Sequence, residues 1–175
     1  MKLHIRLVAI ADNGPEQVHE MASLQRTELQ LETLGLTLAE GKTILREIQR
    51  VVVERQVAEG LERYRHCSAC GQPQRGKGQH DLPMRTVFGR VTIPSPRILY
   101  CECQPHDTKS FSPLAQLLPE RTTPEMLFLE IKWSALVSYG VTADLLQEVL
   151  PMDSPLHAST IREQVFRVAE EWRRN

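Results

Sequence analysis

The sequence predicts an α+β protein with an N-terminal β-hairpin and long helix, a central β module that holds all four cysteines, and three C-terminal helices. Three observations support this fold class. Residues 2–10 alternate between polar and apolar side chains, and residues 37–64 and 122–172 show apolar positions three and four apart. Segments rich in β-forming residues separate two close pairs of cysteines within 67–103. We expect boundaries at 1–64, 65–106, 107–121 and 122–175.

The composition excludes several classes of protein. With 175 residues, of which 41% are hydrophobic and 25% charged, the chain resembles an ordinary folded protein. No apolar run reaches the roughly 18 residues that would cross a bilayer, and the first ten residues alternate instead of forming a signal-peptide core. We therefore expect a cytoplasmic protein without membrane contacts, associated with the nucleoid if it binds DNA.

Residues 2–10 predict a half-buried strand, because apolar Leu3, Ile5, Leu7 and Ala9 alternate with Lys2, His4 and Arg6. Asp12-Asn13-Gly14-Pro15 supplies residues typical of a turn, and 18–24 reads as the return strand. The two strands form the expected hairpin.

A long helix is predicted over 38–63. Thr37 and Glu40 match a capping box, in which each side chain bonds a free backbone amide of the first turn. Such a helix is about 39 Å long at 1.5 Å per residue. Its apolar positions, from Ile44 to Tyr64, spread around more of the helix than one partner would cover. The hairpin is one expected partner, and a second copy of the chain, giving a homodimer, is left open as another.

The cysteines form two close pairs, Cys67-x-x-Cys70 and Cys101-x-Cys103. Two such pairs brought together by strands make a four-thiolate site suited to Zn²⁺, and four protein ligands leave no position for an activated water. The segment therefore predicts a zinc ribbon-like module with structural zinc. Two disulfides are the alternative, which a reducing compartment disfavours. His66, His80 and His106 are the possible replacements for a cysteine ligand.

The strands of this module are expected at 84–88 and 90–93, on either side of Gly89, with a loop at 72–79 before them. Pro94-Ser95-Pro96 is expected to interrupt the pairing, so that 97–100 forms a third short strand leading to Cys101. Residues 107–121 show no clear periodicity and read as a linker.

Charge is distributed unevenly along the chain. The formal net charge is −1, yet residues 63–97 contain seven basic residues and one acidic residue, Asp81. A basic module between acidic flanks is typical of a surface that faces phosphate, although a solvated basic face would look the same. The expected phosphate contacts are Arg75, Lys77, Arg85, Arg90 and Arg97.

The C-terminal helices follow the plan of a helix-turn-helix. Thr122-Thr-Pro-Glu125 predicts a capping box with Pro124 in the first turn, and Gly140 is expected to end that helix. The second helix is expected from a Thr142 cap to Leu150, and the third opens at Ser154-Pro155. Expected core positions are Met126, Leu129, Trp133, Leu136, Leu145, Leu146, Val149, Ile161, Val165, Val168 and Trp172.

In a helix-turn-helix the last helix enters the major groove of DNA. The residues expected to face that groove are His157, Ser159, Thr160, Arg162, Gln164 and Arg167. They can contact both phosphates and base edges. Glu163, Glu170 and Glu171 weaken the electrostatic argument, and three amphipathic helices can also be a packing module only.

Six motifs together resemble the N-terminal region of ISKra-type insertion-sequence transposases. They are LTLAEGK at 36–42, CxxCG at 67–71, RTVFGRV at 85–91 with SPR at 95–97, CxC at 101–103, FSPLAQLLPE at 111–120 and WSALVSYG at 133–140. The resemblance implies the DNA-binding region of a transposase, which recognises the double-stranded ends of the element. It also implies a catalytic RNase H-like domain further downstream, so we expect this chain to be a fragment or a truncated relative without catalysis.

Three functions compete on these grounds. The first is recognition of element-end DNA, and the second is a zinc-stabilised interaction or dimerisation module, or a transposase-derived regulator. The third is a nuclease, which would need acidic side chains gathered around a magnesium ion. No nucleophile with a base and no glycine-rich phosphate loop stands out, so we expect that the chain is not an enzyme.

Overall fold

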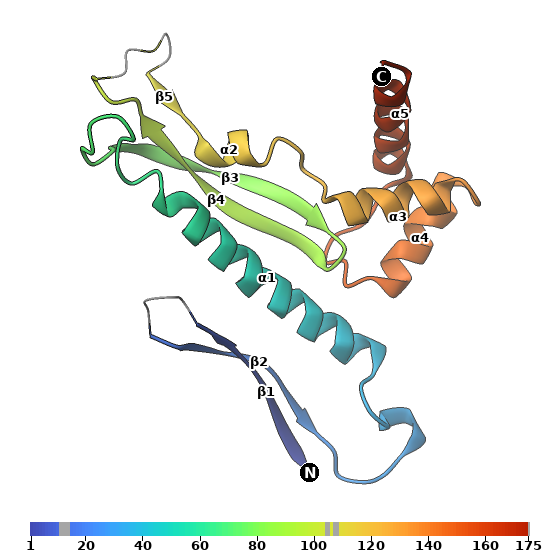
Figure 1. Ribbon diagram of the computed structural model, residues 1–175. Helices are drawn as coiled ribbons and strands as arrows, with labels where there is room; N and C mark the ends of the chain where they lie inside the picture. Colours follow the sequence, from blue (N-terminus) through green and yellow to red (C-terminus); the bar gives the residue numbers. More distant parts are fainter. Residues whose placement is uncertain (11–14, 104–105, 107–108, 175) are drawn as a thin grey trace.

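The computed structural model describes residues 1–10, 15–103, 106 and 109–174 and has an α+β fold, as predicted (Figure 1). Its first part contains strands β1 (Lys2–Ala9) and β2 (Gln17–Gln25), the 3₁₀ helix η1 (Leu31–Thr33) and helix α1 (Leu38–Glu62). Strands β3 (Gly76–Thr86), β4 (Gly89–Leu99) and β5 (Ser110–Phe111) form a second sheet. The remaining helices are α2 (Pro113–Leu117), α3 (Pro124–Ser134), α4 (Tyr139–Val149) and α5 (Ala158–Arg174).

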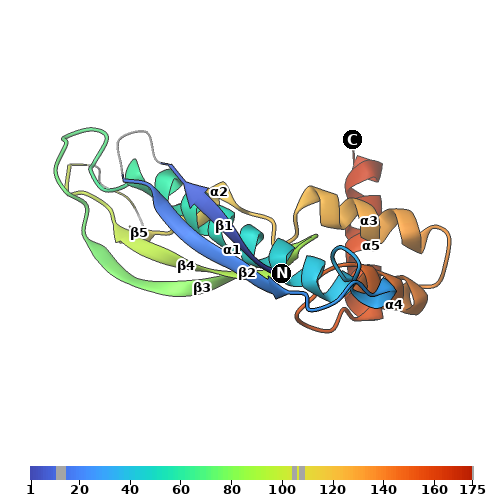
Figure 2. The same ribbon diagram turned by 90° about the horizontal axis from the view of Figure 1, so that it is seen from below.

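Helix α1 lies between the two sheets. The β1–β2 hairpin contacts one side of it and the β3–β4–β5 sheet contacts the other, while α3, α4 and α5 gather beyond the closed end of the β3–β4 hairpin (Figures 1 and 2). On the hairpin side, Val51 is buried and lines a recess with residues 7–10. On the sheet side, Val53, Val57 and Leu61 pack against the buried face of the sheet. Two partners within the same chain therefore cover much of the apolar surface of α1, while Leu38, Leu45 and Val52 stay exposed.

The N-terminal hairpin and the start of α1 confirm their predictions. β1 and β2 pair antiparallel from Lys2 opposite Gln25 to Ala9 opposite Gln17, and residues 11–14 of the expected turn lie outside the described residues. At the start of α1, the hydroxyl of Thr37 accepts from the amide of Glu40, and the Glu40 carboxylate accepts from the amide of Thr37 at 2.9 Å. The capping box is therefore present.

The sheet corrects two predictions. β3 begins at Gly76, so the expected loop at 72–79 is shorter, and β4 runs without a break through Pro94 and Pro96. These prolines pair opposite Asp81 and Gln79 of β3. Residues two apart direct their backbone N–H groups to the same side of a strand, so both missing donors can lie away from β3. The predicted interruption and separate third strand are therefore wrong.

The buried face of this sheet forms one core. Leu82 and Met84 of β3, Val91 and Ile93 of β4, and Leu114 of α2 contact one another there. The last of these lies in the segment predicted as a linker, residues 107–121, whose described residues contain both β5 and α2. The apolar residues of this segment show neither helical nor strand spacing in the sequence, yet Leu114 and Leu118 pack against the sheet of the same chain.

The C-terminal helices exist as predicted, but their starts differ. Pro124 opens α3, as expected. The cap is Thr123 and not Thr122, and its side chain makes no capping bond, so the predicted capping box of Thr122 and Glu125 is wrong. α4 begins at Tyr139 because the hydroxyl of Ser138 accepts from the amide of Val141. Gly140 consequently lies inside α4 and does not end α3, and Thr142 is a buried residue of α4 and not its cap.

A second core joins these helices. Met126 of α3, Leu146 of α4 and Ile161 of α5 are almost completely buried, and Leu129, Trp133 and Val165 pack around them. Four expected core positions are wrong, because their side chains are exposed: Leu136, Leu145, Val149 and Trp172.

Candidate metal centre and basic surface

The first cysteine pair lies in a tight turn after α1. The amide of Cys67 donates to the carbonyl of Gln72 at 2.8 Å, and the amide of Gly71 donates back to the carbonyl of Cys67 at 2.9 Å. Gly71 has a φ of +71°, a conformation that L-residues with side chains rarely adopt. The glycine after the second cysteine thus allows the chain to close around the two sulfurs.

The second cysteine pair follows β4. The amide of Leu99 donates to the carbonyl of Arg75 at 2.9 Å, and the amide of Tyr100 donates to the carbonyl of Lys109 at 3.2 Å. These bonds hold the end of β4 between the chain that leads into β3 and the chain that leads into β5. Cys101 and Cys103 are thereby brought against the turn that holds Cys67 and Cys70.

The four sulfur atoms all lie within 4.8 Å of one another. The Sγ atoms of Cys67 and Cys103 are 3.6 Å apart, and those of Cys70 and Cys101 are 3.4 Å apart. A tetrahedron with metal–sulfur bonds of about 2.3 Å has edges of about 3.8 Å. The cluster can therefore hold a metal ion after small movements of the side chains. Cys67 is buried, whereas Cys70 and Cys103 are exposed.

The thiols of this cluster differ in acidity. Backbone amides of Cys70 and Ala69 donate to the sulfur of Cys67 and lower its pKa to about 6. The thiols of Cys70, Cys101 and Cys67 act in the opposite direction on Cys103 and raise its pKa. Several thiolates at such short distances repel one another, so a cation between them would favour the fully ionised set.

The three histidines considered as replacement ligands lie outside this cluster. Among the residues that the structure describes, the four cysteines form the only group of ligand side chains able to surround a metal ion. The ring of His106 stacks on Tyr100, with ring centroids 3.9 Å apart. His66 forms a backbone bridge to Pro73, and His80 is an exposed residue of β3.

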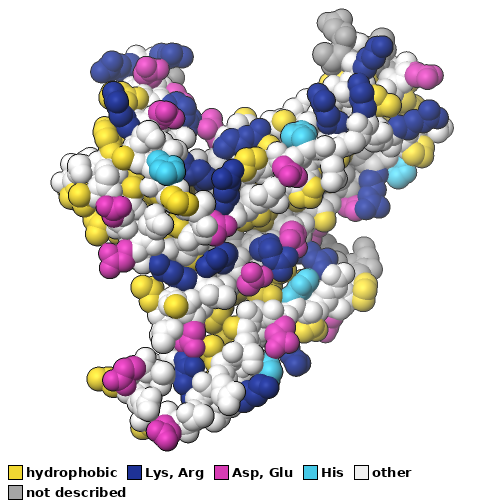
Figure 3. Space-filling model, turned by 180° about the vertical axis from the view of Figure 1, so that it is seen from behind, with side chains coloured by type: hydrophobic (Ala, Val, Ile, Leu, Met, Phe, Trp, Pro, Cys, Tyr) yellow, Lys and Arg dark blue, Asp and Glu magenta, His cyan; other side chains and the backbone are white. Residues whose placement is uncertain are grey.

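Three of the expected phosphate contacts lie close to the cluster. Gly76 pairs opposite Ile98, which places Arg75 and Lys77 at the start of β3 beside Arg97 of β4. All three side chains are exposed, and none forms an ion pair with a described acidic residue. Basic side chains predominate on this arm of the molecule, at the upper right of Figure 3. The cysteine cluster and a basic surface without described ion-pair partners are thus neighbours.

The other two expected phosphate contacts, Arg85 and Arg90, lie at the opposite end of the hairpin. Arg85 directs its guanidinium to the carboxylate of Glu130 in α3, which is completely buried. The Arg85 guanidinium therefore makes its ion pair inside the protein and does not face solvent alone. Arg90 has an exposed side chain, and its backbone amide donates to Asp153 at 3.2 Å.

The residues expected to face DNA on α5 divide into two groups. His157, Ser159 and Arg162 are exposed, and Thr160 is half-buried. Arg167 instead pairs with Glu120 and Glu171 and donates to the side chain of Gln164, which keeps both of these residues in a local network. Sequence reasoning did not single out Phe166, which is 51% exposed beside Arg162. Its position five residues after Ile161 could have indicated a place off the core face.

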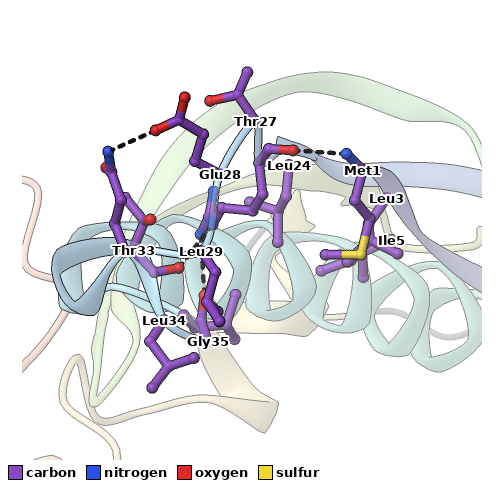
Figure 4. A pocket seen from close by; sticks show the side chains of 13 residues that line it. Met1, Leu3, Ile5, Leu24, Thr27, Glu28, Leu29, Thr33, Leu34 and Gly35 are labelled. Atoms are coloured by element: carbon purple, nitrogen blue, oxygen red, sulfur yellow. Dashed lines mark hydrogen bonds between the residues drawn. The ribbon is translucent and has the colours of Figure 1, made fainter.

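The N-terminal part contains an apolar hollow of about 580 Å³ that no sequence pattern indicated. Side chains of Met1, Leu3, Ile5, Leu29 and Leu34 line it (Figure 4). At the edge of this hollow, the guanidinium of Arg26 donates to the carbonyls of Thr33 and Gly35 at 2.9 and 3.0 Å and links the end of β2 to residues 33–35.

The sequence matches no protein-family profile. No curated protein matches it either. Among the described helices, none combines the length and the apolar character needed to span a membrane.

Proposed function

We propose that this chain is a zinc-stabilised DNA-binding module, and that it is the portion of an insertion-sequence transposase that recognises element-end duplexes. The transposase assignment comes from the motifs at 36–42, 67–71, 85–91, 111–120 and 133–140. Catalysis is not part of the proposal, because the resemblance assigns strand cleavage to a separate RNase H-like domain.

Zinc is the metal that best suits the four cysteines. Four sulfur ligands in CxxC and CxC pairs are typical of structural zinc sites, and this set contains no oxygen ligand of the kind that magnesium or calcium prefers. Cys67, Cys70, Cys101 and Cys103 would hold the ion. Zinc would then join the turn after α1 to the ends of β4 and β5 without taking part in chemistry.

The observation that carries the DNA-binding proposal is the group of exposed cations beside this site. Arg75, Lys77 and Arg97 converge on one end of the β3–β4 hairpin and have no described acidic partner within ion-pair distance. Exposed cations held close together repel one another unless an anion lies between them. A DNA backbone supplies regularly spaced phosphates and would neutralise them.

The C-terminal helices are the proposed source of sequence recognition. α3, α4 and α5 all contact one another, as the three helices of a helix-turn-helix domain do. Residues 150–157 connect α4 to α5, which is longer than the usual three- or four-residue turn. We assign recognition to α5 because the exposed positions of α4 include Val141, Asp144 and Glu148, which suit DNA poorly.

Fluorescence anisotropy tests the proposal with duplexes selected by the protein from a random library and with the ends of its own element. We expect tighter binding to these duplexes than to scrambled ones, and a steep loss of affinity with salt. Changing Arg75, Lys77 and Arg97 together to Gln should weaken binding to every duplex and reduce the salt dependence. Arg50→Gln is the matched control, because Arg50 is already paired with Glu47 and Glu54.

Three results would count against this function. Equal affinity for selected and scrambled duplexes would remove sequence recognition, and no binding at moderate salt would remove DNA binding altogether. Cleavage of duplex DNA with Mg²⁺ by the purified chain would favour a nuclease instead. A full complement of zinc by elemental analysis is expected in each case, and iron or no metal would contradict the zinc assignment.

A second candidate function is an interaction module. The apolar hollow in the N-terminal part is lined by leucines of which Leu29 and Leu34 are largely exposed, and such surfaces can bind another protein. This function predicts a stable dimer or a protein complex without DNA. Light scattering after size-exclusion chromatography would show such a dimer as a doubled mass.

A further inference from the structure

We infer that α5 recognises a thymine next to a guanine, with Phe166 contacting the thymine methyl group and Arg162 bonding the guanine. The inference rests on the proposed DNA binding and adds the bases that the module would select. It starts from Phe166, a large apolar side chain that remains 51% exposed on the helix assigned to recognition.

Phe166 belongs to the outward face of α5. Ile161 and Val165 of the same helix pack into the core with α3 and α4, whereas Ser159, Arg162 and Glu163 share the exposed side with Phe166. Together with Arg167 and Glu170, these residues line a shallow hollow along the helix. Among the described residues, Arg162 is the one side chain recorded in a ring or cation contact with Phe166.

Arg162 is held in place by that contact and not by an acid. The carbon at the centre of its guanidinium lies 5.4 Å from the centre of the Phe166 ring. No described carboxylate pairs with Arg162, in contrast to Arg167, which has Glu120 and Glu171 as partners. The ring therefore limits the rotamers of Arg162 while its N–H groups remain available, which lowers the entropy lost on binding.

The chemistry of the major groove matches this pair. Guanine presents two acceptors, O6 and N7, which an arginine can bond together, and thymine presents an apolar methyl group at C5. Residues four apart on a helix are about 6 Å apart along its axis, whereas bases on one strand are about 3.4 Å apart. Because Arg162 folds back over the ring, its guanidinium and the ring would reach adjacent bases.

Neighbouring side chains also favour base edges over phosphates for this face. Glu163 is exposed beside Arg162 and would repel a phosphate, but a carboxylate can accept a hydrogen bond from the amino group of cytosine. Ser159, one turn earlier, can bond either kind of base. A methyl-binding ring surrounded by such groups is better suited to a groove floor than to a DNA backbone.

The test replaces thymines by deoxyuridine, one at a time, in the best selected duplex. Deoxyuridine differs from thymidine only by the missing methyl group. At one position beside a guanine, this replacement should therefore lower the affinity of the wild-type protein about three- to fivefold, which is the effect of one buried methyl group. Phe166→Ala should bind thymine and uracil duplexes equally at that position. Phe166→Leu, which keeps an apolar contact, should retain part of the difference. Trp172→Ala is the control, since Trp172 is 81% exposed near the end of α5.

Each other outcome has a separate meaning. If the wild-type protein binds selected duplexes but no deoxyuridine weakens binding, the inference is wrong and the proposed DNA binding stands. If Phe166→Ala lowers affinity for the thymine and uracil duplexes by the same factor, so that the wild-type preference for thymine remains, and its helical circular dichroism is unchanged, Phe166 does not contact the methyl group and the inference is also wrong. If the wild-type protein binds no duplex, the proposed function itself fails.

Discussion

At the scale of single residues, the contact between Arg85 and Glu130 links the sheet to the C-terminal helices. The carboxyl group of Glu130 is completely buried, and its Oε2 atom has no described hydrogen-bond partner. Burial raises the pKa of Glu130, and the Arg85 guanidinium beside it offsets only part of that effect. One arginine of β3 therefore makes a buried charge on α3 tolerable.

Removing Arg85 should unfold this junction. Arg85→Ala leaves Glu130 buried without its cation, and we expect a loss of about 3–5 kcal/mol in the free energy of unfolding. Urea denaturation followed by circular dichroism measures this loss. Arg50→Ala, which breaks an exposed pair on α1, should cost less than about 1 kcal/mol. Similar losses for the two variants would contradict a structural role for Arg85.

The pH dependence of stability should report on Glu130 separately. Because its pKa is higher in the folded protein than in the unfolded chain, the folded state holds its proton more tightly. Wild-type stability should therefore fall as the pH rises from the ordinary carboxyl range through this higher pKa. Glu130→Gln cannot ionise and should lack that fall, and parallel pH profiles for the two proteins would contradict the assignment.

Glu40 should show the opposite pH dependence. The guanidinium of Arg26, together with the Thr37 amide and hydroxyl, lowers the pKa of Glu40 from 4.5 to about 2. Its contribution to stability is then present above pH 4.5 and is lost as the pH falls toward 2. Glu40→Gln should lower the Tm at pH 7, and the difference from wild type should disappear near pH 2. Glu59→Gln, an exposed change on the same helix, should leave the Tm nearly unchanged.

Single residues also show what a sequence pattern can and cannot indicate about a site. The spacing of the cysteines correctly indicated that four sulfurs converge, because a CxxC and a CxC pair each set local geometry. Arg85 was grouped with the phosphate contacts because its partner is 45 positions away and no local pattern indicates it. Phe166 was missed for a related reason: whether a ring is covered depends on how the helices pack.

At the scale of elements, the tip of the β3–β4 hairpin depends on a glycine. Gly89 has a φ of +112°, and a Cβ atom there would lie 3.1 Å from the carbonyl oxygen of Pro151. The tip therefore approaches the connection between α4 and α5 so closely that a Cβ atom at this position would crowd the Pro151 carbonyl. Both the conformation and the contact favour glycine.

Gly89→Ala should destabilise the protein by about 1–3 kcal/mol, since it adds backbone strain and a clash at the same place. Thermal unfolding gives the measurement. Gly60→Ala in α1 is the matched control, because its Cβ would meet no described atom within 4 Å and its φ is not positive. That change should stabilise by about 0.5–1 kcal/mol. A neutral Gly89→Ala would mean that the tip can move away from Pro151.

Elements with local signals were predicted best. Alternation identified the first hairpin, and a capping box with regular apolar spacing identified α1. The errors in β4 and α4 arose where two local rules competed. Pro94 and Pro96 would break a strand that is paired on both sides, but they are tolerated in a strand with an open edge. For α4, both Ser138 and Thr142 could cap the helix, and the structure uses Ser138. Only the tertiary structure decides which rule applies.

At the scale of the whole molecule, different bonds hold the two ends of the long β3–β4 hairpin. The cysteine cluster joins its open end to the end of α1 and to β5. Its closed end is joined to the helices by Arg85 with Glu130 and by Arg90 with Asp153. In the proposed zinc-bound form, metal loss should therefore loosen one end of the molecule and leave the other end folded.

Hydrogen exchange with and without a zinc chelator tests this division. After metal removal, amides of residues 67–80 and 95–103 should exchange much faster, because a closed four-thiolate site contributes folding free energy on the order of 10 kcal/mol to the segments that it joins. Amides of α3, α4 and α5 should keep their protection, since their core of Met126, Leu146 and Ile161 contains no metal contact. Cys67→Ser should reproduce the effect of the chelator, and Ser68→Ala, at the exposed neighbouring position, should not. Unchanged exchange at 67–80 after complete metal loss would show that the strands, and not the metal, hold this end together.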